Sequence, residues 1–73
     1  DTVSVYPNPA STVINLSTNL PLSSIEVYDV FGKLLFTKEK DLTHIDVKRY
    51  TPGVYFLVIN VNNQQIVKKV IVN

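Results

Sequence analysis

The stretch VYFLVINV, residues 54–61, is the longest strongly apolar part of the chain and determines the fold class that we expect. Its side chains alternate between two rows; the row from Tyr55 to Val61 is apolar throughout, whereas the other row ends at Asn60. Because successive side chains of a β-strand point to opposite faces, this alternation predicts a strand with the Tyr55 row in the core. The second row leaves an apolar strip that either a neighbouring element covers or a partner binds.

The rest of the chain also favours strands over helices. Twelve valines and six isoleucines stand against one alanine and no methionine, and β-branched side chains fit a pleated sheet better than a helix. Turn-forming residues divide the chain into seven short runs, at 3–6, 13–16, 24–29, 34–37, 44–47, 54–61 and 65–72. No connection between them is long enough for a crossover helix, so the pattern predicts a two-sheet antiparallel sandwich in one all-β domain.

Three turns follow from particular residues. In DVFG, residues 29–32, the aspartate can accept backbone N–H bonds and Gly32 can adopt positive φ, which predicts a type I turn with a bulge. In TPGV, residues 51–54, the proline followed by Gly53 predicts a type II turn. Asn62 and Asn63 tolerate the left-handed region and are expected to join the last two strands as a hairpin.

The last predicted strand, residues 65–72, has a less regular pattern. Lys68 interrupts one row of side chains and Lys69 interrupts the other. A β-bulge at this point would restore a continuous apolar face, and we therefore expect one.

Charge and composition point to few of the usual partners. The net charge is +1, with seven basic and six acidic residues spread along the chain, so we expect no nucleic-acid partner. No apolar run approaches the roughly 20 residues of a membrane-spanning helix, and we expect no membrane insertion. The chain has no cysteine and no clustered metal ligands, and both of its glycines fall in turns, so we expect no metal and no cofactor.

Catalytic groups are equally sparse. The single histidine, His44, falls on the solvent-facing row of the run at 44–47, and no serine or acid stands in an ordered relation to it. We therefore expect a protein that is not an enzyme, with a small hydrolase as one alternative. The chain begins with Asp1 and contains no methionine, which indicates a piece of a longer protein.

Four motifs occur in the order in which one known family carries them. They are YPNPA at 6–10, IEVYD with GKLL at 25–29 and 32–35, PGVYFL at 52–57, and KKVIV at 68–72. Together they resemble the C-terminal sorting domain of the type IX secretion system, type A group, over residues 5–72. The resemblance implies an Ig-like antiparallel β-sandwich of about seven short strands. One departure is Asn73, where members of the family often end in a basic residue.

The resemblance also implies a function as a secretion signal. Residues 1–73 would form a single C-terminal sorting domain, monomeric and fused to an N-terminal cargo in a larger protein of a Gram-negative bacterium. The domain would direct that cargo through the periplasm and the outer-membrane translocon to the cell surface or the medium. A sortase-like peptidase would commonly remove the domain, and many cargoes would then be attached to surface lipopolysaccharide.

Three segments are candidates for recognition by the translocon. Pro7 and Pro9 fix φ and lack an N–H on either side of Asn8, which stiffens the chain after the first strand. Gly53 and Tyr55 are first a turn glycine and a core aromatic, with recognition as a second role. The preferred contact is the C-terminal strand, because an exposed terminal edge is easy for a receptor to pair with. Its candidate residues are Lys68, Lys69, Val70, Ile71 and Val72.

An adhesive or carbohydrate-binding Ig-like module is the alternative function. Such a module would use exposed aromatic side chains as a binding platform. The candidates are Tyr28, Phe31, Tyr50 and Phe56. Unlike a sorting domain, this module would be indifferent to loss of the translocon.

Overall fold

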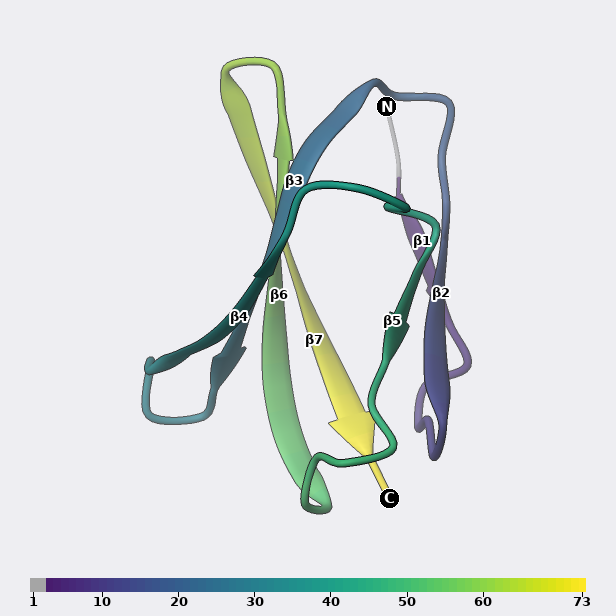
Figure 1. Cartoon of the computed structure of the whole chain (residues 1–73), viewed down its shortest axis with the longest axis vertical. Helices are drawn as coiled ribbons and strands as arrows, with labels where there is room; N and C mark the ends of the chain where they lie inside the picture. The colour runs from purple at the N-terminus through teal and green to yellow at the C-terminus, as the bar shows by residue number, and fades with distance from the viewer. Residues whose placement is uncertain (1–2) are drawn as a thin grey trace.

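A computed structural model describes residues 3–73 as two antiparallel β-sheets packed face to face (Figure 1). The three-stranded sheet has the order β1-β2-β5 and the four-stranded sheet has the order β4-β3-β6-β7. The strands are β1 (Ser4–Tyr6), β2 (Val13–Ser17), β3 (Leu22–Asp29), β4 (Leu34–Lys38), β5 (His44–Asp46), β6 (Gly53–Val61) and β7 (Gln64–Val72). Within residues 3–73 no helix is long and apolar enough to cross a membrane.

The strands confirm the sandwich expected from the sequence. Each of the seven predicted runs contains a strand, and every strand end lies within two residues of its predicted position. The prediction succeeds because alternating β-branched residues and local turn residues place most of the strand limits to within a residue or two.

The core consists of apolar side chains from the facing sides of the two sheets. The Tyr55 row of β6 is buried along its whole length, as predicted, and its other row is half-buried on the outer face of the four-stranded sheet. No polar or charged side chain of the described residues is fully buried. The buried residues are Val3, Ala10, Ile14, Leu16, Ile25, Val27, Ile45, Val47, Tyr55, Leu57, Ile59, Val61, Val70 and Val72.

Two of the three predicted turns are present. Gly32 has φ 87°, and its N–H donates to the Asp29 carbonyl over 3.1 Å. The Asp29 carboxylate also accepts from the N–H groups of Phe31 and Lys33, both at 2.9 Å, so the aspartate organises the turn as expected. At the β6–β7 hairpin, Asn62 has φ 53°, in the left-handed region that asparagine tolerates.

The predicted type II turn at residues 51–54 is wrong. Gly53 has φ 156°, far from the value of about +80° that the third position of a type II turn requires. It is instead the first residue of β6 and pairs with Val72. The ladder between β6 and β7 extends the strand through the position where the local sequence favours a turn, because tertiary pairing overrides local preference.

The predicted bulge in β7 is also wrong. The β6–β7 register runs without a shift from Gly53 opposite Val72 to Val61 opposite Gln64. Lys68 therefore shares the inward row with Val70 and is half-buried. β7 is an edge strand, so the aliphatic stem of Lys68 can lie along the margin of the core while its ammonium group reaches water.

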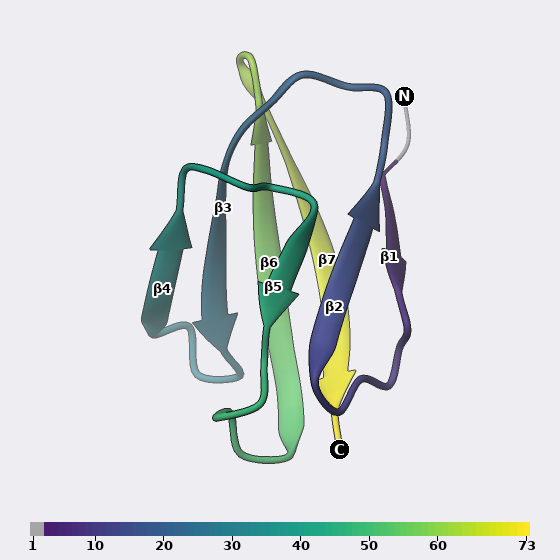
Figure 2. The same ribbon diagram turned by 45° about the vertical axis from the view of Figure 1, so that its right-hand side comes forward.

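The strand directions gather the four sequence motifs at one end of the sandwich (Figure 2). This end, called the motif end, consists of loops 7–12, 30–33 and 47–52 and of residues 69–73 at the end of β7. The opposite end consists of loops 18–21, 39–43 and 62–63. Every one of the four motifs reaches the motif end, although they are spread over the whole sequence.

Candidate functional site

The first and last motifs pair with each other at the motif end. The Asn8 side-chain amide donates from Nδ2 to the Lys69 carbonyl over 3.1 Å, and its Oδ1 accepts from the Ile71 N–H over 2.9 Å. The Ala10 N–H donates to the Ile71 carbonyl and the Ala10 carbonyl accepts from the Asn73 N–H, both at 2.8 Å. These four hydrogen bonds, called the β7 clamp, join residues from the two ends of the sequence.

The chemistry of Asn8 explains how a proline-bracketed segment can pair at all. Pro7 and Pro9 carry no backbone N–H, and β1 ends at Tyr6, as the sequence predicted. A carboxamide presents a donor and an acceptor side by side, much as a peptide group does, so the Asn8 side chain replaces the missing backbone contacts. The peptide bonds before both prolines are cis, and residues 7–9 are exposed.

Ala10 is a site residue that the sequence analysis missed. It is 1% exposed and forms a parallel bridge with Val72, which brings the β1–β2 connection of one sheet against an edge strand of the other. A larger side chain would meet the core at this close approach. The available signal was that this residue, directly after the second proline, is the single alanine in a chain rich in branched side chains.

Gly53 and Tyr55 place the third motif beside the same clamp. Gly53 pairs with Val72 and Tyr55 pairs with Val70, so both touch the strand that Asn8 holds. Tyr55 is 7% exposed; its hydroxyl donates to the Thr51 carbonyl over 2.6 Å, and its ring centroid lies 5.1 Å from that of Tyr50. The ring therefore holds loop 47–52 against the core and is not available to a partner in the folded domain.

The five candidates at the chain end divide into inward and outward side chains. Val70 and Val72 are buried, and Lys68 is half-buried on the same inward row. Lys69 and Ile71 point to the outer face of the four-stranded sheet and are exposed. Of the five candidates, therefore, Lys69 and Ile71 present exposed side chains at the surface.

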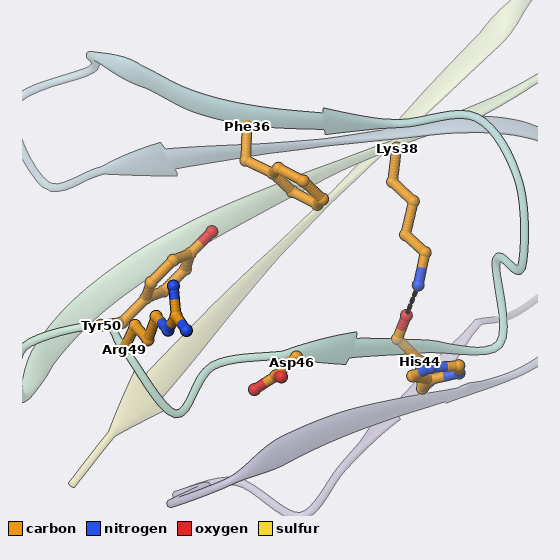
Figure 3. A pocket seen from close by; sticks show the side chains of 6 residues that line it. All are labelled: Phe36, Lys38, His44, Asp46, Arg49 and Tyr50. Atoms are coloured by element: carbon orange, nitrogen blue, oxygen red, sulfur yellow. Dashed lines mark hydrogen bonds between the residues drawn. The ribbon is translucent and has the colours of Figure 1, made fainter.

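A cleft of about 460 Å³ lies on another side of the sandwich, between the edge strands β4 and β5 (Figure 3). Lys38 spans it, with its Nζ donating to the His44 carbonyl over 2.7 Å. Burial raises the pKa of Tyr50 above its usual value, and Tyr55 and Asp46 add to the effect. The cleft is lined by Phe36, Lys38, His44, Asp46, Arg49 and Tyr50.

His44 and the acids of the described chain form no metal-binding group. The His44 Nδ1 lies 3.4 Å from the neighbouring Thr43 hydroxyl, at an exposed position. Within residues 3–73 no three His, Cys, Asp or Glu side chains are close enough together to hold a metal ion.

The four aromatic side chains suggested for an adhesive platform lie in three places. Tyr28 and Phe56 are paired across β3 and β6, on the outer face of the four-stranded sheet. Phe31 is 91% exposed in the β3–β4 turn, and Tyr50 lines the cleft. The Tyr28 hydroxyl donates to the Glu26 carboxylate over 3.0 Å, and this hydrogen bond raises the pKa of Tyr28. Their arrangement does not favour a single binding platform.

A family model matches nearly the whole chain. The family model described as "secretion system C-terminal sorting domain" matches residues 4–73, essentially the whole chain and all four motifs. No curated protein sequence matches the chain.

Proposed function

Because this chain belongs to the family of secretion system C-terminal sorting domains, we propose that the type IX translocon recognises it at the motif end. A domain of this family is the C-terminal secretion signal for type IX secretion. It marks the protein that carries it for export to the cell surface or the extracellular space. Membership therefore implies an interaction with the type IX secretion system and fusion to a cargo.

The β7 clamp is the observation that carries this proposal. It brings the first and the last motif into direct contact, and Gly53 of the third motif pairs with the same stretch of β7. One receptor surface could therefore contact three motifs at once. The exposed candidates Pro7, Asn8, Pro9 and Lys69 would be contacted directly, together with Ile71.

The buried candidates have a supporting role in this proposal. Tyr55, Val70 and Val72 lie in the core beneath the clamp and hold its residues in place. Their replacement would reduce export mainly by loosening the fold, whereas replacement of Lys69 would act on the contact itself. Replacement of Lys68 would affect both the fold and the contact, because this residue is half-buried and shares the inward row.

We also propose that the domain acts by being bound and has no catalytic role of its own. The cargo would precede β1, whose first residue Ser4 pairs with Ser17 at the opposite end of the sandwich. The cargo and the motif end would then lie at opposite ends of the domain. The translocon could therefore bind the motif end without contacting the cargo. A sortase-like peptidase would cut the chain before β1.

The test is export of a fusion in a host that has the type IX machinery. Residues 1–73 are placed behind a fluorescent protein with an inner-membrane leader, and the secreted and periplasmic fractions are measured. We expect secretion in the competent host and periplasmic retention in a host without the translocon. Equal export in both hosts would overturn the proposed function, and an adhesive module predicts that indifference.

Single lysine variants locate the contact within the domain. Lys69→Ala is expected to lower the secreted fraction, whereas Lys40→Ala, which removes the same charge from the opposite end, is expected to leave it unchanged. Both side chains are exposed, so each variant should change stability by no more than about 0.5 kcal/mol. The double variant Lys68→Ala with Lys69→Ala should lose more export, but its melting temperature must be measured beside it because Lys68 is half-buried.

A further inference from the structure

The free edge of β7 is covered over only part of its length. β7 pairs with β6 on one side from Gln64 to Val72. On the other side, the β7 clamp uses the Lys69 carbonyl, both backbone groups of Ile71 and the Asn73 N–H. The clamp does not reach beyond Lys69 toward the opposite end.

The geometry of a strand identifies which backbone groups remain open. The N–H and C=O of one residue point to the same side of a strand, and the side alternates from residue to residue. Since both groups of Ile71 point away from β6, those of Lys69, Val67 and Gln65 do so as well. In the described chain, the Lys69 N–H and both groups of Val67 and Gln65 have no hydrogen-bond partner.

Among the described residues, no side chain along this open edge covers its backbone groups. Val67 is 59% exposed, and Gln65 and Lys69 are exposed beside it. The edge is regular, since β7 pairs with β6 over nine residues without a bulge. At the other edge of the same sheet, the pairing of β4 with β3 has a register shift, because Val27 is opposite Phe36 and Tyr28 is opposite Leu34, and such irregularities normally protect an edge from pairing.

We propose that residues 65–69 of β7 are a docking site for an extended strand of the type IX machinery, an inference that rests on the proposed function. The incoming strand adds to the four-stranded sheet next to β7 and stops where Asn8 already occupies the edge. Backbone hydrogen bonds supply the attraction and the side chains supply selectivity. Five residues of strand span about 17 Å, which limits the partner segment to about that length.

Charge and burial define the partner strand further. Lys69 on the outer face and Lys68 on the inner side lie at the clamp end of the site, whereas Val67 lies at its centre and Ile66 follows toward its other end. The matching strand carries a carboxylate toward the lysines and an apolar side chain beside Val67. Lysines at an edge also discourage pairing with a second copy of this domain, because like charges would face each other. The edge therefore favours an acidic partner strand.

A proline at Val67 tests the site directly. The Val67 N–H points away from β6, so Val67→Pro removes a hydrogen-bond donor of the open edge and keeps the β6–β7 ladder. In the export fusion we expect Val67→Pro to reduce the secreted fraction about tenfold, through one lost hydrogen bond and the added ring. The matched variant Val67→Ala keeps the N–H and loses only part of the side-chain contact, so its secreted fraction should fall much less than that of Val67→Pro.

Crosslinking gives a second measurement, which does not require that the Val67→Pro variant folds. The chain contains no cysteine, so Val67→Cys carries a photoreactive maleimide at one position. We expect it to capture a type IX component in the outer membrane of the competent host. Thr37→Cys, on the exposed edge strand β4, should capture none.

The outcomes separate this inference from the proposed function. Normal secretion of a folded Val67→Pro fusion, or absence of a crosslink at position 67 with an exported fusion, overturns the docking site and leaves the sorting function intact. Capture of a type IX component from position 67 and not from position 37 supports the site. Retention of the unaltered fusion overturns the proposed function and this inference with it.

Discussion

The two ends of the sandwich are held together in different ways. At the motif end, Asn8 bonds to Lys69 and Ile71, which lie 61 and 63 residues away in the sequence. At the opposite end, one hydrogen bond of the described residues runs locally from the Leu20 N–H to the Thr18 hydroxyl, and others join neighbouring strands of one sheet. The bonds between Ser23 or Ser24 and Asn60 are of the second kind. The motif end is thus where the first and last segments of the chain meet.

This difference has a consequence for recognition. A surface built from residues 8, 10, 53 and 69–73 is complete only after the whole domain has folded. A receptor that binds this surface therefore distinguishes a folded sorting domain from an unfolded one. At the opposite end, the bonds between Ser23 or Ser24 and Asn60 join two neighbouring strands, β3 and β6, of one sheet.

The largest expected effect tests whether packing beneath the clamp holds the end of β7. Val70 is 1% exposed and Val67 is 59% exposed on the same strand. Val70→Ala should lower the free energy of unfolding by roughly 2–3 kcal/mol, through lost burial and the cavity left behind. Val67→Ala should cost no more than about 0.5 kcal/mol. Chemical denaturation of the two variants measures the difference, and equal losses would contradict the inward assignment of Val70.

The next effect tests the clamp itself. Asn8→Ala removes both side-chain hydrogen bonds to β7 and should cost about 1–2 kcal/mol, since each bond contributes about 0.5–1.5 kcal/mol and this site is exposed. The control, Asn63→Ala in the hairpin at the opposite end, should cost less than about 0.5 kcal/mol. Thermal melts of both variants give the comparison. Equal losses of stability in the two variants would contradict a stabilising role for the β7 clamp.

The clamp also marks the limit of what the sequence could predict. Strands such as β6 and the turn after Asp29 depend on residues close together in the chain, so their patterns are visible in the sequence. The pairing of Asn8 with β7 depends on a side chain that takes the place of a backbone across more than sixty residues, and no local pattern reports it. The errors at Gly53 and Lys68 have the same origin, because pairing of β6 with β7 overrides the local preferences there.

A comparable effect tests that correction at the two glycines, both of which lie at the motif end. An added Cβ would meet open space at either position, so backbone conformation alone decides the cost. Both glycines have positive φ, 87° at Gly32 and 156° at Gly53, a conformation that L side chains rarely adopt. Gly32→Ala should cost about 1–2 kcal/mol, and Gly53→Ala should cost more, because extended backbone with positive φ is almost restricted to glycine. An equal or smaller loss at Gly53, measured by denaturation, would restore the type II turn that the sequence suggested.

The smallest expected effect is a loss of stability at alkaline pH that begins at the motif end, where Tyr50 lies. Burial first, then Tyr55 and Asp46, raise the pKa of Tyr50 above its usual value of 10.0. Folding therefore favours the neutral phenol, and this contribution to stability is fully present below about pH 10. It is lost as pH rises from there through the higher pKa of the folded state, because the unfolded chain gives up the proton more readily.

Tyr50→Phe removes this titration while keeping the ring against Tyr55. In the described chain the Tyr50 hydroxyl has no hydrogen-bond partner, so stability at pH 7 should change by no more than about 0.5 kcal/mol. Between pH 9 and 11 the variant should lose less stability than the parent, measured by denaturation at each pH. Amide NMR signals should show where the parent loosens: we expect changes first in loop 47–52 and residues 69–73, and later in loops 18–21 and 62–63. If parent and variant lost stability equally with rising pH, titration of Tyr50 would not be the cause of the loss.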